Sequence, residues 1–331
     1  GGGGCGRRAR ARARAVRVAR GAAGGGGRFW ASVTLPAAGA AATQGTVFFA
    51  HGFAQGPESY AGMAGALADQ GLALVAPHTS IFSWPVWRSL GRRARELRPD
   101  GPVSLRDFGA VLQYSLQAQL AEDLLTCVRV VRGGPGPSRP TCALREAVPA
   151  AARARSGLLG HSMGAGLLFW AARAAGVPCA ACLAPLSDLR GPLRPGPVAR
   201  SLRRRVDCLV LAAEEDGFAP PRACEGLARD VNGSPGGGRA LFLSVPGGTH
   251  TGFEDCVSLG RLPLAALLGA PRAAAALPEL AAALPELAAA LFRPQRLADQ
   301  RAARDAALAA WLAPAVLARA PPARAALEAA L

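Results

Sequence analysis

Lysine is absent from this sequence, so all 38 basic residues are arginines, set against 22 acidic residues. The formal net charge of +16 would ordinarily suggest a nucleic acid or an anionic surface as a partner. No nucleic-acid-binding motif accompanies the arginines, however, and the excess of alanine, glycine and proline is typical of a GC-rich coding sequence. We therefore predict no nucleic-acid partner.

Long uncharged apolar runs are also missing. No apolar run of 18 or more residues free of charge occurs, so the sequence predicts no transmembrane segment. Half of the 331 residues are hydrophobic, which is enough to bury a sizeable core in one large domain or two small ones. The eight cysteines leave the redox compartment open, and we interpret Cys179 and Cys182 as small core residues on the same face of a buried strand.

Acidic residues are absent from residues 1–27, which are near-repeats of glycine, alanine and arginine. An arginine-rich segment without acidic residues is typical of an organelle transit peptide, which would place the mature protein in a plastid. A low-complexity leader outside the fold is the alternative interpretation. Either interpretation predicts that the folded domain begins at about residue 28.

A second compositional change follows residue 256. The heptad A-L-P-E-L-A-A occurs twice in succession, at 276–282 and 283–289. A proline in every heptad prevents a long helix, because proline lacks the backbone donor and clashes with the preceding turn. We therefore predict a catalytic domain over 28–315, interrupted by an alanine-, leucine- and proline-rich insertion at 257–294 and followed by a tail at 316–331.

Between these segments, apolar strand-like runs alternate with helical patterns. Such runs occur at 29–35, 46–50, 72–76, 158–159, 179–183, 208–213 and 240–245. Helical patterns occupy 58–70, 108–132 and 296–313, and a long loop is expected at 78–105. Strands that are apolar throughout and alternate with helices predict an α/β fold with a mainly parallel sheet covered on both faces.

The segment G-H-S-M-G at 160–164 has the G-x-S-x-G pattern of a nucleophile elbow. An apolar run precedes it and an alanine- and leucine-rich helical segment follows it. A serine on a sharp strand-to-helix turn has a strained backbone, and the flanking glycines let the strand and the helix approach each other. The pattern predicts that Ser162 is a nucleophile, with a glycine-rich turn around a solvated serine as the alternative.

A serine hydroxyl needs a positioned base, and the chain has only four histidines. His250 alone lies in a glycine-rich loop after a strand that follows Ser162, so we predict that it is the base. His161, next to Ser162, is expected to point away from it. Asp216, after the strand at 208–213, is the predicted orienting acid, with Glu214 and Glu215 as competitors.

An oxyanion hole needs backbone N–H donors near the nucleophile. One donor is expected from Met163, directly after Ser162. The other is expected from the His51-Gly52-Phe53 loop, most directly from Phe53. This chemistry requires no metal and no cofactor.

These motifs identify a resemblance to the α/β-hydrolase-fold serine esterases, over about residues 28–255 and the helix at 296–313. The G-H-S-M-G segment and the D-G-F-A-P segment at 216–220 resemble those of polyester hydrolases and other cutinase-like enzymes. The H-G-F segment at 51–53 resembles that of chlorophyllases, and platelet-activating-factor acetylhydrolases are also similar. Leu186 stands where the polyester hydrolases carry an aromatic residue.

The resemblance implies a carboxylesterase or lipase-like enzyme acting on a small-molecule or lipid-like ester. It also implies that Leu186 and Phe218 line the substrate pocket. A chlorophyllase-like hydrolysis of a long-chain tetrapyrrole ester is one alternative. A non-catalytic hydrolase-fold protein that binds a small ligand is another, and the sequence leaves the oligomeric state open.

Overall fold

One eight-stranded sheet forms the centre of the computed structural model, which describes residues 11–19, 27–37, 42–53, 55–80, 84–97, 105–134, 139–186, 206–233, 238–255, 294–317 and 327–328. The strand order is β1-β2-β4-β3-β5-β6-β7-β8. Strand β2 runs antiparallel to both β1 and β4, and the other neighbours are parallel. This order and these directions define the α/β-hydrolase fold, so the predicted fold class is confirmed.

The strands are short and mostly buried, as their apolar runs predict. Their bounds are β1 (Arg12–Ala19), β2 (Arg28–Leu35), β3 (Gly45–Ala50), β4 (Leu72–His78), β5 (Ser156–His161), β6 (Cys179–Leu183), β7 (Asp207–Ala213) and β8 (Ala240–Val245). Every residue of β3, β5 and β6 is buried, because these strands lie in the middle of the sheet with helices on both faces.

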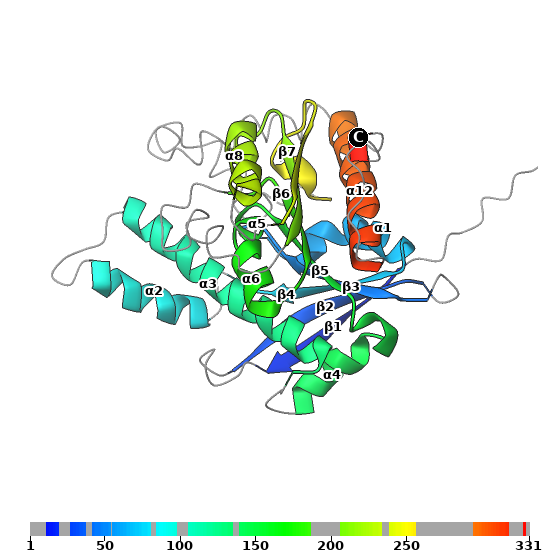
Figure 1. Ribbon diagram of the computed structural model, residues 1–331. Coiled ribbons are helices and arrows are strands. Elements are labelled where there is room, and N and C mark those ends of the chain that lie inside the picture. Colours follow the sequence, from blue (N-terminus) through cyan, green and yellow to red (C-terminus); the bar gives the residue numbers. More distant parts are fainter. Residues whose placement is uncertain are drawn as a thin grey trace, which may run out of the picture.

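Helices cover both faces of the sheet (Figure 1). The α-helices are α1 (Ala61–Asp69), α2 (Trp84–Leu97), α3 (Leu105–Arg132), α4 (Arg139–Ala147), α5 (Met163–Gly166), α6 (Leu168–Ala175), α8 (Pro221–Asn232) and α12 (Pro294–Leu317), and short 3-10 turns are η2 (Pro57–Tyr60), η3 (Ala150–Ala152) and η4 (Thr251–Phe253). Helices α1 and α12 lie on one side of the sheet, and α3, α5, α6 and α8 on the other.

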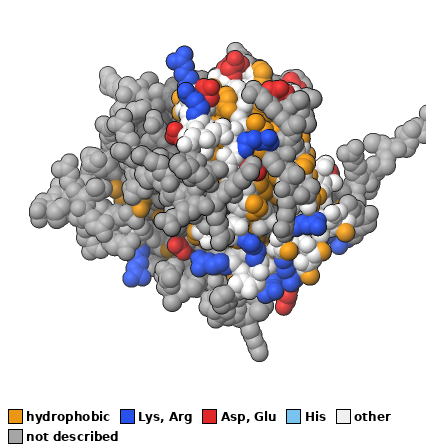
Figure 2. Space-filling model, in the orientation of Figure 1, with side chains coloured by type: hydrophobic (Ala, Val, Ile, Leu, Met, Phe, Trp, Pro, Cys, Tyr) orange, Lys and Arg blue, Asp and Glu red, His pale blue; other side chains and the backbone are white. Residues whose placement is uncertain are grey.

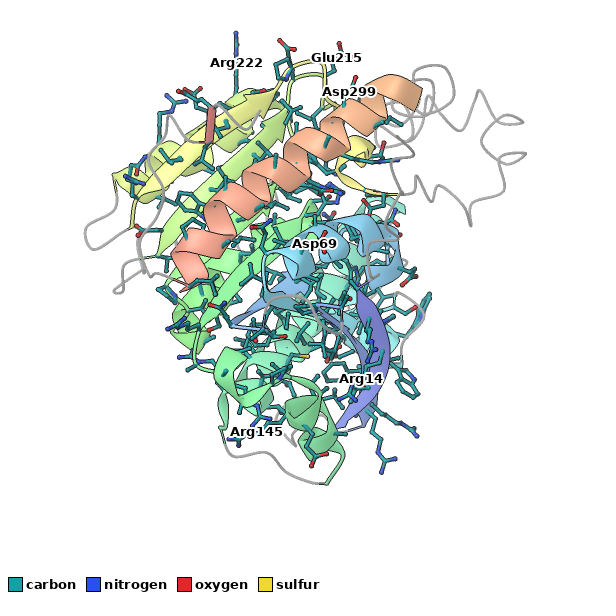
Figure 3. The ribbon with its side chains drawn as sticks, turned by 90° about the vertical axis from the view of Figure 1, so that its right-hand side faces the viewer. Arg14, Asp69, Arg145, Glu215, Arg222 and Asp299 are labelled. Carbon is teal, nitrogen blue, oxygen red and sulfur yellow. The ribbon has the colours of Figure 1, made fainter. Side chains whose placement is uncertain are left out.

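Helix α12 lies obliquely across the strands (Figure 3). The indole N–H of its fully buried Trp311 donates to the carbonyl of Ala180 in β6, at 3.0 Å. A Cβ atom at Gly157 of β5 would lie 2.8 Å from the Val316 side chain, so glycine permits the close approach of helix and strand. The last long helix is therefore part of the core.

Part of the N-terminal segment belongs to the fold, which corrects the expectation that the folded domain begins at about residue 28. Residues 12–19 pair with β2 along their whole length, from Arg12 opposite Leu35 to Ala19 opposite Arg28. Val16 and Val18 of this strand are buried in the core. Arg12, Arg14 (labelled in Figure 3) and Arg17 are exposed on this edge strand, and Arg12 and Arg14 lie on the same face as Val16 and Val18 but in its exposed half. The sequence over residues 12–19 therefore shows no alternation of buried and exposed residues that would have indicated a strand.

Two further boundaries differ from expectation. The region 78–105 contains helix α2, so it is not one long loop. Helix α12 continues through Pro314 to Leu317, so the tail begins later than residue 316, and Leu327 within the expected tail is fully buried. The expected insertion at 257–294 lies outside the described residues except for Pro294.

The two cysteines of β6 lie on opposite faces of the sheet, and not on the same face as expected. The Cys179 sulfur lies on the side of Gly157 that faces α12, whereas the Cys182 sulfur approaches the carbonyl of Ala165 in α5. Side chains three residues apart in a strand must alternate in this way. Both thiols are buried core groups.

The described surface is unevenly charged. Figure 2 shows arginine side chains along the lower part of one face and most of its acidic side chains near the upper end. Figure 3 places Glu215 and Arg222 at that upper end, where β7 ends and α8 begins. Acidic and basic side chains therefore lie side by side where β7 ends and α8 begins.

The packing of α12 makes a stability prediction. Trp311→Phe removes part of a buried side chain and leaves the Ala180 carbonyl without its donor, so we expect the free energy of unfolding to fall by about 2 kcal/mol. Trp87→Phe in α2 is the matched control, because Trp87 is 43% exposed. Its effect should stay within about 0.5 kcal/mol. Urea unfolding measures both variants, and equal effects would contradict a core role for α12.

Candidate active site

Ser162 occupies a strained turn between β5 and α5. Its backbone angles are φ 56° and ψ −122°, which a residue with a side chain rarely adopts. Three backbone hydrogen bonds hold it there: the Ser162 N–H donates to Leu183 at 2.8 Å, and its carbonyl accepts from Gly166 at 3.2 Å and Leu186 at 3.3 Å. The ends of β5, β6 and α5 therefore determine the position of this serine together.

The two glycines that flank Ser162 are required by space. A Cβ atom at Gly160 would lie 2.8 Å from the Cα of Ala165, and one at Gly164 would overlap the carbonyl oxygens of Ala50 and His51. Strand β5 and helix α5 therefore approach as closely as the elbow pattern predicted, and α5 also packs against the end of β3. This approach brings the loop after β3 next to Ser162.

The structure brings Ser162, His250 and Asp216 together at the carboxyl edge of the sheet. His250 Nε2 lies 2.8 Å from Ser162 Oγ, and His250 Nδ1 lies 2.7 Å from Asp216 Oδ2. All three residues are buried, each less than 8% exposed. Oxygen Oδ1 of Asp216 accepts the N–H groups of Phe218 and Ala219, so the carboxylate is fixed at both oxygens.

This pattern also defines the proton positions. A carboxylate only accepts, so the proton on the histidine lies at Nδ1 and is donated to Asp216. Nε2 of His250 is then free to accept the Ser162 hydroxyl proton. The competing acids lie elsewhere: Glu214 accepts the N–H of Gly247, and the Glu215 side chain is exposed.

Helix α12 holds the loop that carries His250. The Gln300 side chain accepts the N–H of Thr249 at 2.9 Å and donates to the Thr249 carbonyl at 2.7 Å. The guanidinium of Arg304, which is fully buried, donates to the Phe253 carbonyl and pairs with Asp255 at 2.7 Å. Sequence analysis missed both residues, because only tertiary structure brings residues 300–304 to residues 249–255.

The expected oxyanion donors lie on either side of Ser162. Met163 is the first residue of α5, where N–H groups have no partner within the helix. On the other side lies Gly52: a Cβ atom added to it would be 3.5 Å from Ser162 Cβ. The Phe53 N–H belongs to the peptide that joins Gly52 and Phe53, so the orientation of that peptide decides where the donor points.

His51 fixes the orientation of that peptide. Its Nδ1–H donates to the Gly52 carbonyl at 2.9 Å, while its Nε2 accepts the N–H of Thr79 at 3.3 Å. In a trans peptide the N–H points opposite to the C=O, so the Phe53 N–H points away from the His51 ring. Burial lowers the pKa of His51 to about 4, and the ring therefore stays neutral with its proton on Nδ1.

The two residues expected to line the pocket are next to this group. The Phe218 ring lies 5.2 Å from the His250 ring, centroid to centroid, at an angle of 47°. Leu186 is partly buried, and its N–H bonds to the Ser162 carbonyl. The Phe53 side chain is 42% exposed, whereas that of Met163 is fully buried. Contact with a substrate stays a prediction for Leu186 and Phe218.

His161 is the residue whose surroundings the sequence did not indicate. Its ring packs 4.9 Å from the His250 ring. Its Nδ1 lies 2.8 Å from the Tyr60 hydroxyl, and its Nε2 lies 3.2 Å from the His250 carbonyl. Burial lowers the pKa of His161 well below its usual value, so this ring is neutral too.

Comparison with known proteins gives structural similarity alone. No protein-family model and no curated protein matches the sequence. Among solved structures, the chain is similar to the carboxylesterase EstE1 from a metagenomic library (16% identity, 83% of this chain and 88% of that one, TM-score 0.48). It is also similar to dienelactone hydrolase from Anabaena variabilis (17% identity, 80% of this chain and 95% of that one, TM-score 0.46). A third similar structure is an α/β serine hydrolase without lid from Xanthomonas campestris (17% identity, 73% of this chain and 86% of that one, TM-score 0.44).

Among the helices that the structure describes, none combines the length and the apolar character needed to cross a membrane.

The elbow geometry predicts opposite effects for two glycine substitutions. Gly164→Ala would place a methyl group on the Ala50 and His51 carbonyls, so we expect a loss of at least about 2 kcal/mol of unfolding free energy. Gly226→Ala is the matched control in α8, where nothing lies within 4 Å of the added Cβ. It should stabilise the protein by about 0.5–1 kcal/mol. Urea unfolding of both variants tests this, and a stable Gly164→Ala protein would contradict the close approach of β3 and α5.

The neutral buried histidines predict a loss of stability in acid. The unfolded chain binds a proton at His51 near pH 6.5, whereas the folded protein does so only near pH 4. The unfolded state therefore holds more protons between these values, and the free energy of unfolding falls as the pH falls through this window. His51 alone should contribute a loss of about 2 kcal/mol between pH 7 and pH 5.

The variant that isolates this effect is His51→Asn, which cannot titrate. It should be less stable than the wild type at pH 7, but its further loss between pH 7 and pH 5 should be smaller by about 2 kcal/mol. Urea unfolding at the two pH values gives both quantities. The same pH-dependent loss in both proteins would show that His51 is not the group responsible.

Proposed function

We propose that this protein is a serine hydrolase that cleaves a carboxylic ester through an acyl-enzyme intermediate. The observation that carries the proposal is the hydrogen-bonded series from Ser162 Oγ through the His250 ring to Asp216, at 2.8 and 2.7 Å. A protein that merely binds a ligand in this fold has no need of all three groups in this order. The hydrogen-bonded series therefore favours catalysis over binding alone.

The proposed reaction begins when Ser162 Oγ attacks the ester carbonyl and its proton passes to His250 Nε2. The Asp216 carboxylate stabilises the imidazolium that forms and keeps the ring in its orientation. The N–H groups of Met163 and Phe53 hold the oxyanion, and each such donor is worth roughly 3 kcal/mol in the transition state. His250 then gives the proton to the leaving alkoxide.

Deacylation follows the same path in reverse. A water molecule gives its proton to His250 Nε2 and attacks the acyl carbonyl. The second tetrahedral intermediate collapses, the Ser162 oxygen leaves, and His250 returns the proton to it. The products are the free acid and the alcohol, and no metal or cofactor takes part in the proposed steps.

The apolar side chains at the site support a hydrophobic substrate. Phe53, which follows Gly52 in the loop next to Ser162, is 42% exposed, and the Phe218 ring packs against that of His250. Such surfaces suit an apolar acyl or alcohol group better than a charged one. The narrower proposal of a long-chain tetrapyrrole ester rests on the H-G-F segment at 51–53, and a panel of p-nitrophenyl esters with chlorophyll as one member would test it.

Active-site labelling tests the proposed function. We expect a fluorophosphonate probe to label the wild type at Ser162, and Ser162→Ala to lose both labelling and esterase activity. Asp216→Asn should lower kcat by about 10⁴, because the histidine then takes the wrong tautomer. Glu215→Gln is the matched control, since the Glu215 side chain is exposed and should leave kcat unchanged. A folded wild-type protein that does not react with the probe would refute the proposal.

A further inference from the structure

A chain of hydrogen bonds passes behind the nucleophile and joins the loop after β3 to the loop after β8. The Gly52 N–H lies 3.3 Å from the Tyr60 hydroxyl oxygen. That hydroxyl lies 2.8 Å from His161 Nδ1, and His161 Nε2 lies 3.2 Å from the His250 carbonyl. Both Tyr60 and His161 are fully buried.

Only one arrangement of protons satisfies all three contacts. The His250 carbonyl can only accept, so His161 carries its proton on Nε2 and donates it. His161 is neutral, because burial lowers its pKa, and its Nδ1 therefore accepts from the Tyr60 O–H. Burial likewise raises the pKa of Tyr60, which keeps its proton, and the Tyr60 oxygen accepts from Gly52.

The charged groups near this chain leave the direction of its hydrogen bonds unchanged. Glu254 Oε1 lies 3.8 Å from His161 Nδ1, and Arg304, which donates to the Phe253 carbonyl, acts on His161 in the opposite sense. The His250 ring on the other side becomes an imidazolium in the proposed reaction. A positive charge on His161 would oppose that step, so a neutral ring suits this position.

We propose that Tyr60 and His161 are positioning residues that hold the base His250 and the oxyanion loop at Gly52 in one fixed geometry around Ser162. The inference rests on the proposed function, because it gives the pair a role in that same reaction. Helix α12 holds the residues on either side of the base, through Thr249 and Phe253. His161 holds the main chain of the base itself.

The reaction requires that the loop after β3 and the loop after β8 be positioned together, which one chain of hydrogen bonds can do. Proton transfer needs His250 Nε2 at hydrogen-bond distance from Ser162 Oγ, and the oxyanion donor must point at the oxygen of the carbonyl that Ser162 attacks. A displacement of about 1 Å in such a site costs about 10²-fold in rate. A hydrogen-bond chain that ends on Gly52 at one side and on His250 at the other keeps the two loops in a constant position relative to each other.

Three conservative variants test this role. Tyr60→Phe removes the hydroxyl, and His161→Phe keeps an aromatic ring but removes both hydrogen bonds. We expect each to lower kcat for a p-nitrophenyl ester by about 10- to 100-fold with little change in KM, since neither side chain is predicted to contact the substrate. His161→Gln retains a donor for the His250 carbonyl and should recover part of the lost kcat.

The double variant Tyr60→Phe/His161→Phe tests whether the two residues act together. If they form one chain, the kcat of the double variant should be at most about threefold below that of the less active single variant. Independent residues would instead lower kcat by the product of the two single losses. Titration with the fluorophosphonate counts the folded active sites in each preparation. The kcat values therefore refer only to folded protein.

The matched control is Thr46→Val, which removes a buried hydrogen bond to the Ala152 carbonyl at the opposite edge of the sheet. It should lower stability and leave kcat unchanged. The inference would be overturned if both single variants kept the kcat of the wild type or changed KM alone. It would also be overturned if the losses of kcat multiplied in the double variant, or if Thr46→Val lost as much kcat as the single variants. Failure of the wild type to react with the probe would instead refute the proposed function.

Discussion

A serine backbone at φ 56° and ψ −122° is the constraint on which the site depends. Such a conformation costs on the order of 1–3 kcal/mol and persists only where the surroundings determine it fully. Here the end of β6, helix α5 and Leu186 all form backbone hydrogen bonds with Ser162. The same turn forces β3 and α5 so close that glycine alone fits at position 164, and this brings Gly52 to the nucleophile.

The remaining parts of the site are arranged around that fixed point. His250 reaches Ser162 from a loop held by α12 through Gln300 and Arg304. The Asp216 carboxylate accepts from two N–H groups of its own turn. His51 and Tyr60 hold the main chain of Gly52 on both sides, His51 at its carbonyl and Tyr60 at its N–H. Each reacting group is thus positioned by hydrogen bonds between elements distant in sequence.

Several parts of the molecule could be predicted because local chemistry determines them. Apolar runs identified the buried strands, and the 3.6-residue pattern identified most of the long helix α3. The spacing of Gly160 and Gly164 around Ser162 followed from the space available in a tight turn. Where composition was unusual, the same reasoning failed: the arginine-rich strand β1 was interpreted as a leader, and α2 as loop.

The sequence by itself determined the elbow, the order of serine, acid and histidine along the chain, and the fold class. The sequence favoured Asp216 over Glu214 and Glu215 as the partner of His250, and only the folded turn after β7 shows that Asp216 lies at hydrogen-bond distance from it. Tertiary structure alone decided that His161 and Tyr60 join the two loops. Periodicity records which face of an element is buried, whereas hydrogen bonds between distant loops depend on packing that no local pattern encodes.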